Sequence, residues 1–330
     1  MIGDARVLQP AFVPREVEHR DGEVDALTNA LDPITRGETA SLFGPSGTGK
    51  TCIAQYTVER LREQVLDTEY QYANYWRDYT RHRALYRVLE AIEGTLDIHR
   101  QPTPADELSE RLRSYDGTPH VVVLDEVDQL RDTSVLYDLY STHDCTMVLI
   151  ANRQAAVFDD LDDRLSSRLH SARRVRFDRY SRDELVAILE ARVKWGLTSA
   201  VDRTYLEHIA DAAAGDARIA TGILRNAARD AERAGREEFT TGSVEGAIAE
   251  ARQQVRRTSL ETLTRRQRVP YDVIDEYGEI DPGELYGQYQ ERVSDPKTKR
   301  TVRNHLQKMV RCDLAVADGE KRARTYRIRN

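Results

Sequence analysis

Residues 44–51 read Gly44-Pro45-Ser46-Gly47-Thr48-Gly49-Lys50-Thr51, and this octet says more about the fold than any other stretch of the chain. It matches the pattern G-x-x-x-x-G-K-[ST], in which glycines let backbone N–H groups turn inward around phosphate oxygens. Residues 39–43 predict a strand before the octet, and residues 52–64 predict a helix whose positive end faces the same anion. We therefore predict a phosphate-binding loop in which Lys50 contacts the β- and γ-phosphates and Thr51 ligates Mg²⁺. The expected nucleotide contacts of this segment are Pro45, Ser46, Gly47, Thr48, Gly49, Lys50, Thr51 and Cys52.

The segment after the octet alternates between strand and helix patterns. Two continuous apolar runs, 120–124 and 146–150, are typical of parallel strands buried on both faces. A further strand is expected at 69–75. Helices are expected at 21–31, 80–93, 105–115 and 134–140. Strands that alternate with helices predict an α/β fold with a doubly wound parallel sheet.

The pattern changes after residue 177. Four helical stretches follow without a strand between them, at 182–194, 202–213, 217–234 and 243–255, which predicts an all-helical domain. From residue 258 three short helices are expected at 271–277, 282–292 and 298–310, followed by a hairpin of 314–318 and 324–328. Three helices closed by a basic hairpin are the pattern of a winged helix. The expected domains are 1–178, 179–257 and 258–330.

Charge is divided unevenly along the 330 residues, whose net charge is −7. Residues 252–330 carry 18 Lys and Arg against 12 Asp and Glu, so the remainder is strongly acidic. A basic C-terminal segment on an acidic body predicts a polyanion as partner. The chain has no apolar run long enough to span a membrane and no apolar signal core, so we expect a cytoplasmic protein with no membrane partner. Cys52, Cys145 and Cys312 have neither metal-site spacing nor an even count for disulfides.

ATP hydrolysis needs more than a phosphate loop, and the sequence offers candidates. Asp125 and Glu126 end the apolar run at 120–124, where Asp125 can hold Mg²⁺ and Glu126 can activate water as a general base. The alternative is an acidic pair that opens a helix. Asn152 follows the next buried run and can orient the water, although a turn-forming Asn is the alternative.

Arginines are the remaining catalytic candidates. Arg164 and Arg168 lie in a charged run, and either can reach the γ-phosphate of a neighbouring subunit or belong to a solvated face. Arg218 begins a helix of the all-helical domain and can contact the γ-phosphate in cis. An Arg early in a helix gains nothing from the helix dipole, which favours a functional reason.

The order of these motifs resembles that of AAA+ ATPases: Walker A, Walker B, sensor 1, arginine finger and sensor 2. Flanking stretches resemble archaeal Orc/Cdc-type replication initiators. These stretches are Phe12-Val13-Pro14-Arg15-Glu16 with His19-Arg20, Tyr72-Ala73-Asn74-Tyr75-Trp76 with Thr80-Arg81 and 85–89, and Gly215-Asp216-Ala217-Arg218 with Leu224-Arg225.

The resemblance implies an AAA+ domain, a helical lid and a winged helix, with ATP or ADP and Mg²⁺ as cofactors. It also implies slow, switch-like ATP hydrolysis, binding to double-stranded DNA at a replication origin, and help in loading the replicative helicase. Val13, Pro14 and Arg20 are implied as the adenine pocket. The finger comes from a second copy or a paralogue; Arg164 and Arg168 both fit, and we prefer Arg168.

The DNA contacts are expected on the third helix and the hairpin of the winged helix. Arg303 and Asn304 can read base edges, and the Lys and Arg side chains can bind phosphates. A solvated basic face or a protein-binding winged helix is the alternative. The expected residues are Lys297, Lys299, Arg300, Arg303, Asn304, Lys308, Lys321, Arg322, Arg324 and Arg327.

Two other functions remain open. A paralogue that regulates transcription or maintenance of a plasmid or viral element would use the same motifs, with hydrolysis as a timer. The chain's brief C-terminal domain fits such a paralogue. A helicase-loading or clamp-loading machine that acts mainly through protein contacts would not need residues 258–330.

Overall fold

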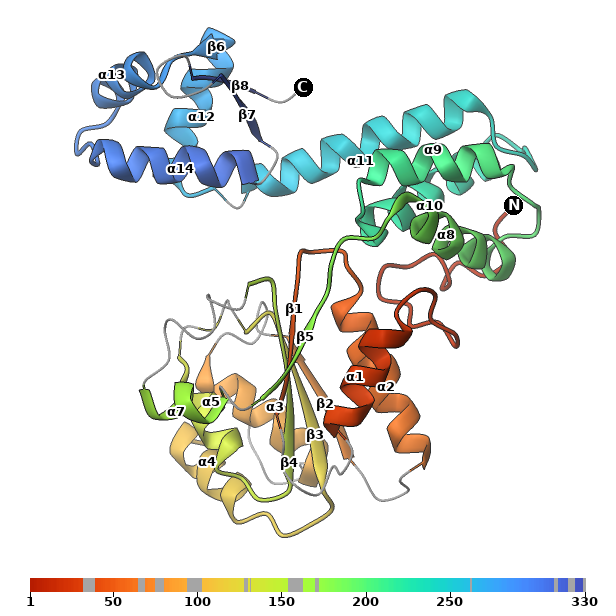
Figure 1. Cartoon of the computed structure of the whole chain (residues 1–330), viewed down its shortest axis with the longest axis vertical. Coiled ribbons are helices and arrows are strands. Elements are labelled where there is room, and N and C mark those ends of the chain that lie inside the picture. Colours follow the sequence, from red (N-terminus) through yellow and green to blue (C-terminus); the bar gives the residue numbers. More distant parts are fainter. Residues whose placement is uncertain are drawn as a thin grey trace. The chain divides into compact units, whose positions relative to one another are not determined.

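The structure is a computed structural model of the chain, which divides into two compact units, Met1–Val244 and Glu245–Asn330 (Figure 1). Each unit is described by itself. The structure describes residues 1–31, 39–64, 69–74, 80–93, 103–127, 130, 132–153, 163–169, 172–261, 263–311, 314–319 and 324–328.

A parallel sheet forms the centre of the first unit. Its strands are β1 (Ala40–Phe43), β2 (Glu69–Asn74), β3 (His120–Asp125), β4 (Cys145–Ala151) and β5 (Arg173–Arg176). They lie in the order β2-β3-β4-β1-β5, so the strand that precedes the phosphate loop is inside the sheet. Phe43 pairs with Ala151, so the loop after β1 and the segment after β4 begin at the same edge. Ligands of open α/β sheets bind at this carboxyl edge.

Helices cover both faces of this sheet, as the doubly wound prediction requires (Figure 1). On one face lie α1 (Asp21–Leu31) and α2 (Lys50–Gln64). On the other face lie α3 (Arg81–Glu93), α4 (Ala105–Arg113), α5 (Ser134–Tyr140) and α7 (Asp163–Leu169). The prediction of a doubly wound α/β fold is confirmed.

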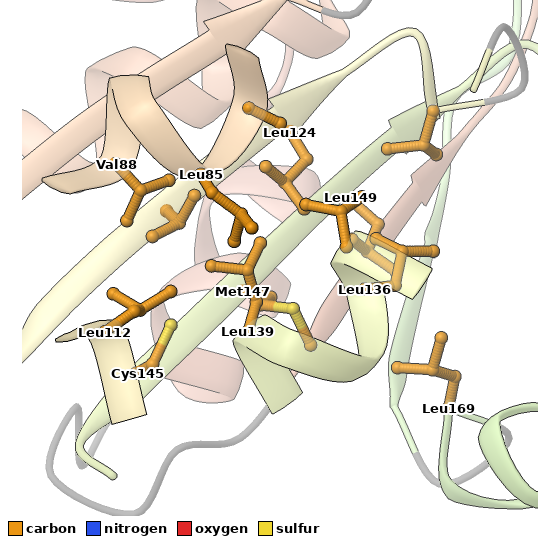
Figure 2. Close-up of a cluster of buried hydrophobic side chains, with 14 of the residues drawn as sticks. Leu85, Val88, Leu112, Leu124, Leu136, Leu139, Cys145, Met147, Leu149 and Leu169 are labelled. Atoms are coloured by element: carbon orange, nitrogen blue, oxygen red, sulfur yellow. The ribbon is translucent and has the colours of Figure 1, made fainter. Parts of the chain in front are cut away.

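The side chains of β3 show why hydrophobic residues fill both faces of the sheet. Val121 and Val123 of β3 pack toward α1 and α2, whereas Leu124 packs toward α3, α4 and α5. Figure 2 shows the hydrophobic cluster on the face covered by α3, α4 and α5, where Leu85 lies beside Leu124 and Leu136 lies beside Leu149. Because successive side chains of a strand point to opposite faces, a continuous apolar run serves both layers.

The helical lid consists of α8 (Arg182–Gly196), α9 (Arg203–Ala213) and α10 (Ala217–Arg233), followed by α11 (Thr241–Glu261), which continues into the second unit. Side-chain caps fix where these helices begin. Ser181 and Glu184 form a capping box at α8, and Asp202 and Asp216 cap α9 and α10. The all-helical lid prediction is confirmed.

The N-terminal arm, residues 1–20, turns over the lid and then leads into α1. The amides of Gly3 and Asp4 donate to the carbonyl of Gly196 at the end of α8, at 2.9 and 3.1 Å. Ile2 and Leu197 form an isolated antiparallel bridge. Leu8 of the arm is 1% exposed. The arm is therefore anchored to the lid before it reaches the α/β domain.

The second unit packs three helices against a small antiparallel sheet. Its further elements are α12 (Arg265–Tyr277), β6 (Glu279–Ile280), α13 (Pro282–Arg292), α14 (Lys299–Arg311), β7 (Ala315–Asp318) and β8 (Thr325–Ile328), with the strands in the order β6-β8-β7. The core of this unit contains Ile274, Leu285, Tyr289 and Met309. Apart from the start of α12 and the short strand β6, which was not predicted, the helices and hairpin lie where the sequence predicted them; assignment to the winged-helix class stays a prediction.

One helix begins earlier than expected. The prediction placed its start at residue 271, after Pro270, but α12 begins at Arg265 and contains that proline. Proline inside a helix removes one backbone hydrogen bond. Thr264 and Gln267 form a capping box that stabilises the first turn and offsets part of this loss.

Within the described residues, no helix is both long and apolar enough to cross a membrane.

Candidate functional site

The phosphate loop joins β1 to α2, and the side chain of its lysine, Lys50, binds back to the loop's own carbonyl oxygens. The Lys50 side chain is buried, and its Nζ donates to the carbonyl oxygens of Gly44 and Pro45, both at 2.7 Å. Nζ also lies 3.4 Å from Oδ1 of Asn152. The Thr48 hydroxyl donates to the Pro45 carbonyl at 2.8 Å. The ammonium group is thus held where the loop curves, which is the place of a phosphate in this motif.

Two loop glycines are required by what packs against them. Gly47 has φ of 74° and Gly49 has φ of 90°, conformations that other residues rarely adopt. A Cβ at Gly47 would overlap the carboxylate of Asp216, from the lid. A Cβ at Gly49 would lie 2.5 Å from the hydroxyl of Tyr180, in the segment that leads into α8. The loop is therefore packed directly against lid residues.

Oxygen ligands for a cation meet beside the loop. The Thr51 hydroxyl donates to Oδ2 of Asp125 at 2.7 Å, joining the first turn of α2 to the end of β3. Asp125 is buried, and its Oδ1 accepts from the backbone N–H of Glu126 at 2.9 Å. Hydroxyl and carboxylate oxygens are the ligands that Mg²⁺ prefers. The pair fits a magnesium ion bound to nucleotide phosphates.

Glu126 has a strained backbone. Its φ is 57°, in the left-handed region, which costs a non-glycine residue roughly 1 kcal/mol or more. The side chain is half-buried. Such strain is retained where the surrounding structure enforces it, often at active sites. The backbone of Glu126 is therefore held in a costly conformation directly after the Asp125 carboxylate.

The structure brings some predicted catalytic residues together and leaves others undescribed. Asn152 is exposed at the end of β4 and contacts Lys50. Arg218 is exposed in the first turn of α10. Arg164 and Arg168 belong to α7, but their side chains lie outside the described residues. Their assignment as arginine finger stays a prediction.

The lid touches the phosphate loop through the start of α10. The amide of Ala217 donates to the Gly47 carbonyl at 3.0 Å. The Asp216 carboxylate accepts from the amides of Arg218 and Ile219, at 2.9 and 3.0 Å. The neighbouring Arg218 is thereby brought to the loop. Sequence reasoning missed Asp216, although Asn and Asp are common helix caps and its place in the Gly215–Arg218 stretch was visible.

Arg20 joins the N-terminal arm to the segment between core and lid. Its guanidinium donates to the Asp178 carbonyl at 2.7 Å and pairs with Glu23. It also lies 4.0 Å from the ring centre of Tyr180 and 5.5 Å from that of Phe177. Burial raises the pKa of Tyr180, and the neighbouring Arg20 opposes the shift. Tyr180 is a second residue that sequence reasoning missed, because its two contacts come from distant segments.

The other residues expected to contact the nucleotide are Val13 and Pro14 of the arm and Cys52 of α2. Val13 and Pro14 are half-buried in the arm. Cys52 lies in the first turn of α2, and burial raises the pKa of its thiol to about 11. Cys52 therefore behaves as a neutral, small side chain beside the site.

The candidate DNA-contact surface of the second unit is the exposed side of α14 with the hairpin β7–β8. Val302, Leu306 and Met309 of α14 are buried, whereas Arg303 and Asn304 are exposed. The exposed or half-exposed candidates are Lys297, Lys299, Arg300, Arg303, Asn304, Arg324 and Arg327. Lys321, Arg322 and the side chain of Lys308 lie outside the described residues.

Some of these cations already have partners. Arg327 Nε donates to Asp318 Oδ2 at 2.8 Å within the hairpin. Lys297 Nζ lies 3.4 Å from Asp295 Oδ2. Lys299 Nζ lies 5.3 Å from the ring centre of Tyr286. Phosphates would have to replace the two carboxylates, so these residues offer less to DNA than their charge suggests.

Comparison with known proteins agrees with this geometry. Residues 16–150 match the AAA ATPase domain, and residues 186–249 match the Cdc6 AAA+ ATPase-type lid domain. The chain is 51% identical to ORC1-type DNA replication protein 9 of Halobacterium salinarum over 332 residues, covering 99% of this chain and 94% of that protein. It is 50% identical to ORC1-type DNA replication protein 1 of the same organism, covering 92% of this chain and 100% of that protein.

Solved structures show the same fold. The Aeropyrum pernix ORC1 protein in complex with DNA has a TM-score of 0.74 and 26% identity, covering 99% of this chain and 93% of that chain. The Aeropyrum pernix ORC2 protein, solved as ADPNP–ADP complexes, has a TM-score of 0.72 and 21% identity, covering 99% and 94%.

Proposed function

The chain belongs to the family of ORC1-type DNA replication proteins and is an AAA+ ATPase, and from this premise we propose that it is an origin-binding replication initiator. It binds double-stranded DNA through a C-terminal winged helix and helps recruit or load the replicative helicase. Slow ATP hydrolysis switches it between states. The observation that carries this proposal is one chain with both a phosphate loop joined to its magnesium-ligand candidates and a basic helix–hairpin unit.

The nucleotide site assigns a task to each side chain. Lys50 binds the β- and γ-phosphates. Its ammonium group then gives up its hydrogen bonds to the carbonyls of Gly44 and Pro45. Thr51 and Asp125 would hold Mg²⁺, which neutralises phosphate charge. Glu126 takes a proton from the attacking water, and Asn152 orients that water.

Arginines complete the proposed site. Arg218, brought to the loop by the Ala217–Gly47 hydrogen bond, contacts the γ-phosphate in cis. The arginine finger, Arg168 or Arg164, is supplied by a second copy or a paralogue bound alongside on DNA. Arg218 and the arginine finger both stabilise the negative charge that develops on the transferred phosphate.

The second unit is proposed to dock as winged helices do. The exposed side of α14 enters the major groove, where Arg303 and Asn304 read base edges. The hairpin β7–β8 contacts the backbone through Arg324, and through Arg327 once its partner Asp318 has been displaced. The Aeropyrum pernix ORC1 protein, similar to this chain over 93% of its own length, was solved in complex with DNA.

Competition binding tests the DNA assignment. The full chain with ATP and Mg²⁺ is titrated onto a labelled duplex from its host's replication start region, at several salt concentrations, with random duplex as competitor. Arg303→Ala combined with Arg324→Ala is expected to remove the preference for the origin duplex. Equal affinity for origin and random duplex in the unmodified protein would contradict the proposal.

A second candidate function is supported by the two Halobacterium salinarum relatives, which have nearly equal identity to this chain. Family members therefore occur as paralogues in one organism, and a paralogue can regulate transcription or maintenance of a plasmid or viral element. A binding site confined to its own promoter, with replication unaffected by deletion, would favour this function.

A further inference from the structure

Arg192 of α8 binds the N-terminal arm at two points of its backbone. Its guanidinium donates to the backbone carbonyl of Val7 and, at 3.2 Å, to that of Phe12. It also lies 4.9 Å from the ring centre of Phe12. One side chain therefore fixes both ends of the segment 7–12. Burial lowers the pKa of Arg192, because its charged form has lost contact with water. The carbonyls of Val7 and Phe12 replace part of that hydration.

The rest of the lid is shaped to receive the same segment. At Gly196 a Cβ would come within 3.1 Å of Leu8 and 3.3 Å of Val7, so a larger residue would require these side chains to shift. Arg225 of α10 donates to the Gln9 side chain at 3.3 Å. Val7 and Leu8 are both buried. The arm is thus a fixed part of the lid surface.

The arm then returns to the nucleotide site. Residues 13–20 end at Arg20, which lies against Tyr180, and the Tyr180 hydroxyl lies against the phosphate-loop residue Gly49. Arg192 also lies near Cys52, the residue after Thr51, and its positive charge partly opposes the rise in the pKa of that thiol. A chain of contacts therefore runs from lid helix α8 through the arm to the phosphate loop. It is separate from the Ala217–Gly47 contact of α10.

We propose that Arg192 is a positioning residue for the nucleotide: by holding residues 7–12 on the lid, it fixes residues 13–20 beside the phosphate loop and so slows release of the bound adenine nucleotide. The proposal deepens the nucleotide site of the proposed function and makes no use of DNA. Since Arg192 acts through the arm, its loss affects ADP and ATP alike. A direct contact between Arg192 and a phosphate would instead affect the two nucleotides unequally.

Release of a fluorescent ADP analogue, chased with excess ADP in a stopped-flow experiment without DNA, tests the proposal. The full chain with Mg²⁺ is compared with Arg192→Ala and Arg192→Lys. We expect Arg192→Ala to release the nucleotide about tenfold faster, the same factor to hold for a slowly hydrolysed ATP analogue, and kcat to change less than KM. Lysine can still donate to the carbonyls but stacks less well on Phe12, so Arg192→Lys is expected to restore part of the effect.

The matched control is Arg203→Ala. Arg203 is exposed on the same lid and pairs with Glu190 and with Glu207, so its loss is expected to change release less than twofold. A melting curve for each variant separates nucleotide release from lid stability.

Deletion of residues 1–12 supplies the second test, which holds even if Arg192→Ala folds poorly. The deletion is expected to accelerate release as Arg192→Ala does, and the two changes together are expected to add nothing further. Additive effects, release that Arg192→Ala leaves unchanged, or unequal effects on ADP and ATP would overturn the proposal. Because no DNA is present, these results stand whether or not the chain binds origins.

Discussion

His120, the first residue of β3, couples stability to pH. It is 1% exposed, and burial lowers its pKa from 6.5 to about 4. The unfolded chain takes up a proton below about pH 6.5, whereas the folded chain does so only near pH 4. The free energy of unfolding therefore falls as pH drops between these values, by about 3 kcal/mol from this residue at 1.36 kcal/mol per pKa unit.

Urea unfolding at pH 7 and pH 4.5 checks this expectation. His120→Leu removes the titrating group and is expected to flatten the acid loss of stability. The exposed His143, changed to Gln, is the control and is expected to leave the pH profile as it was. An unchanged profile in His120→Leu would show that other groups cause the acid loss.

Glu126 is the residue on which hydrolysis is expected to depend. Glu126→Gln keeps the shape of the side chain but cannot accept a proton, so ATP binding is retained and single-turnover hydrolysis falls by roughly 100-fold or more. The exposed Glu110 on α4, changed to Gln, is the control. Normal hydrolysis in Glu126→Gln would remove Glu126 as the base and leave Asp125 and a bound water to be examined.

At the scale of elements, two tyrosines set the start of α14. The Tyr286 hydroxyl donates to the carbonyl of Lys297 at 3.1 Å, and the Lys297 amide donates to the Tyr289 hydroxyl at 3.3 Å. Tyr286→Phe removes one of these bonds, which is worth about 1 kcal/mol. We expect a three- to fivefold loss of DNA affinity, measured by fluorescence anisotropy, and a melting temperature lower by a few degrees. Tyr277→Phe, at a 41% exposed position of the same unit, is the control, and equal affinity in both variants would contradict the expectation.

The central strands could be predicted from sequence, and an edge strand could not. β3 and β4 are continuous apolar runs because both of their faces are buried. β5 was not predicted, since it reads Arg-Arg-Val-Arg and only Val175 is buried. Charged side chains on an edge strand discourage pairing with other chains, and they also hide the strand from a hydrophobicity pattern.

The residues of the nucleotide site likewise divide into those that could be predicted from sequence and those that could not. Lys50, Thr51 and Asp125 follow from motif spacing, because the loop and the strand end are local features. The packing of Tyr180 and Asp216 against the loop glycines is a tertiary contact that sequence spacing does not reveal, although Asp216 could be recognised as a helix cap. The anchoring of the arm by Arg192 was likewise invisible before the fold was known.

At the scale of the whole molecule, the nucleotide site is expected to be incomplete in a single copy. If the arginine finger comes from a neighbour, ATP turnover per molecule rises with protein concentration and with origin DNA. A mixture of Arg168→Ala and Lys50→Ala proteins is expected to recover turnover that neither shows alone. Turnover per molecule that stays constant across a 100-fold concentration range would contradict a finger in trans.

Charge divides the chain into an acidic first part and a basic end, where residues 297–330 carry 11 Lys and Arg against 3 Asp and Glu. Each phosphate contact releases condensed counterions, so DNA affinity is expected to fall steeply with salt. Base and shape recognition must then supply the preference for particular sites.

The most direct test of the replication-initiator function is the genome-wide occupancy of the tagged protein in its host, with wild type compared with Lys50→Ala. A replication initiator is expected to occupy one or a few sharp sites in noncoding DNA that coincide with replication start sites, and Lys50→Ala is expected to weaken them. Diffuse occupancy, or a single site at its own promoter, would contradict the initiator function.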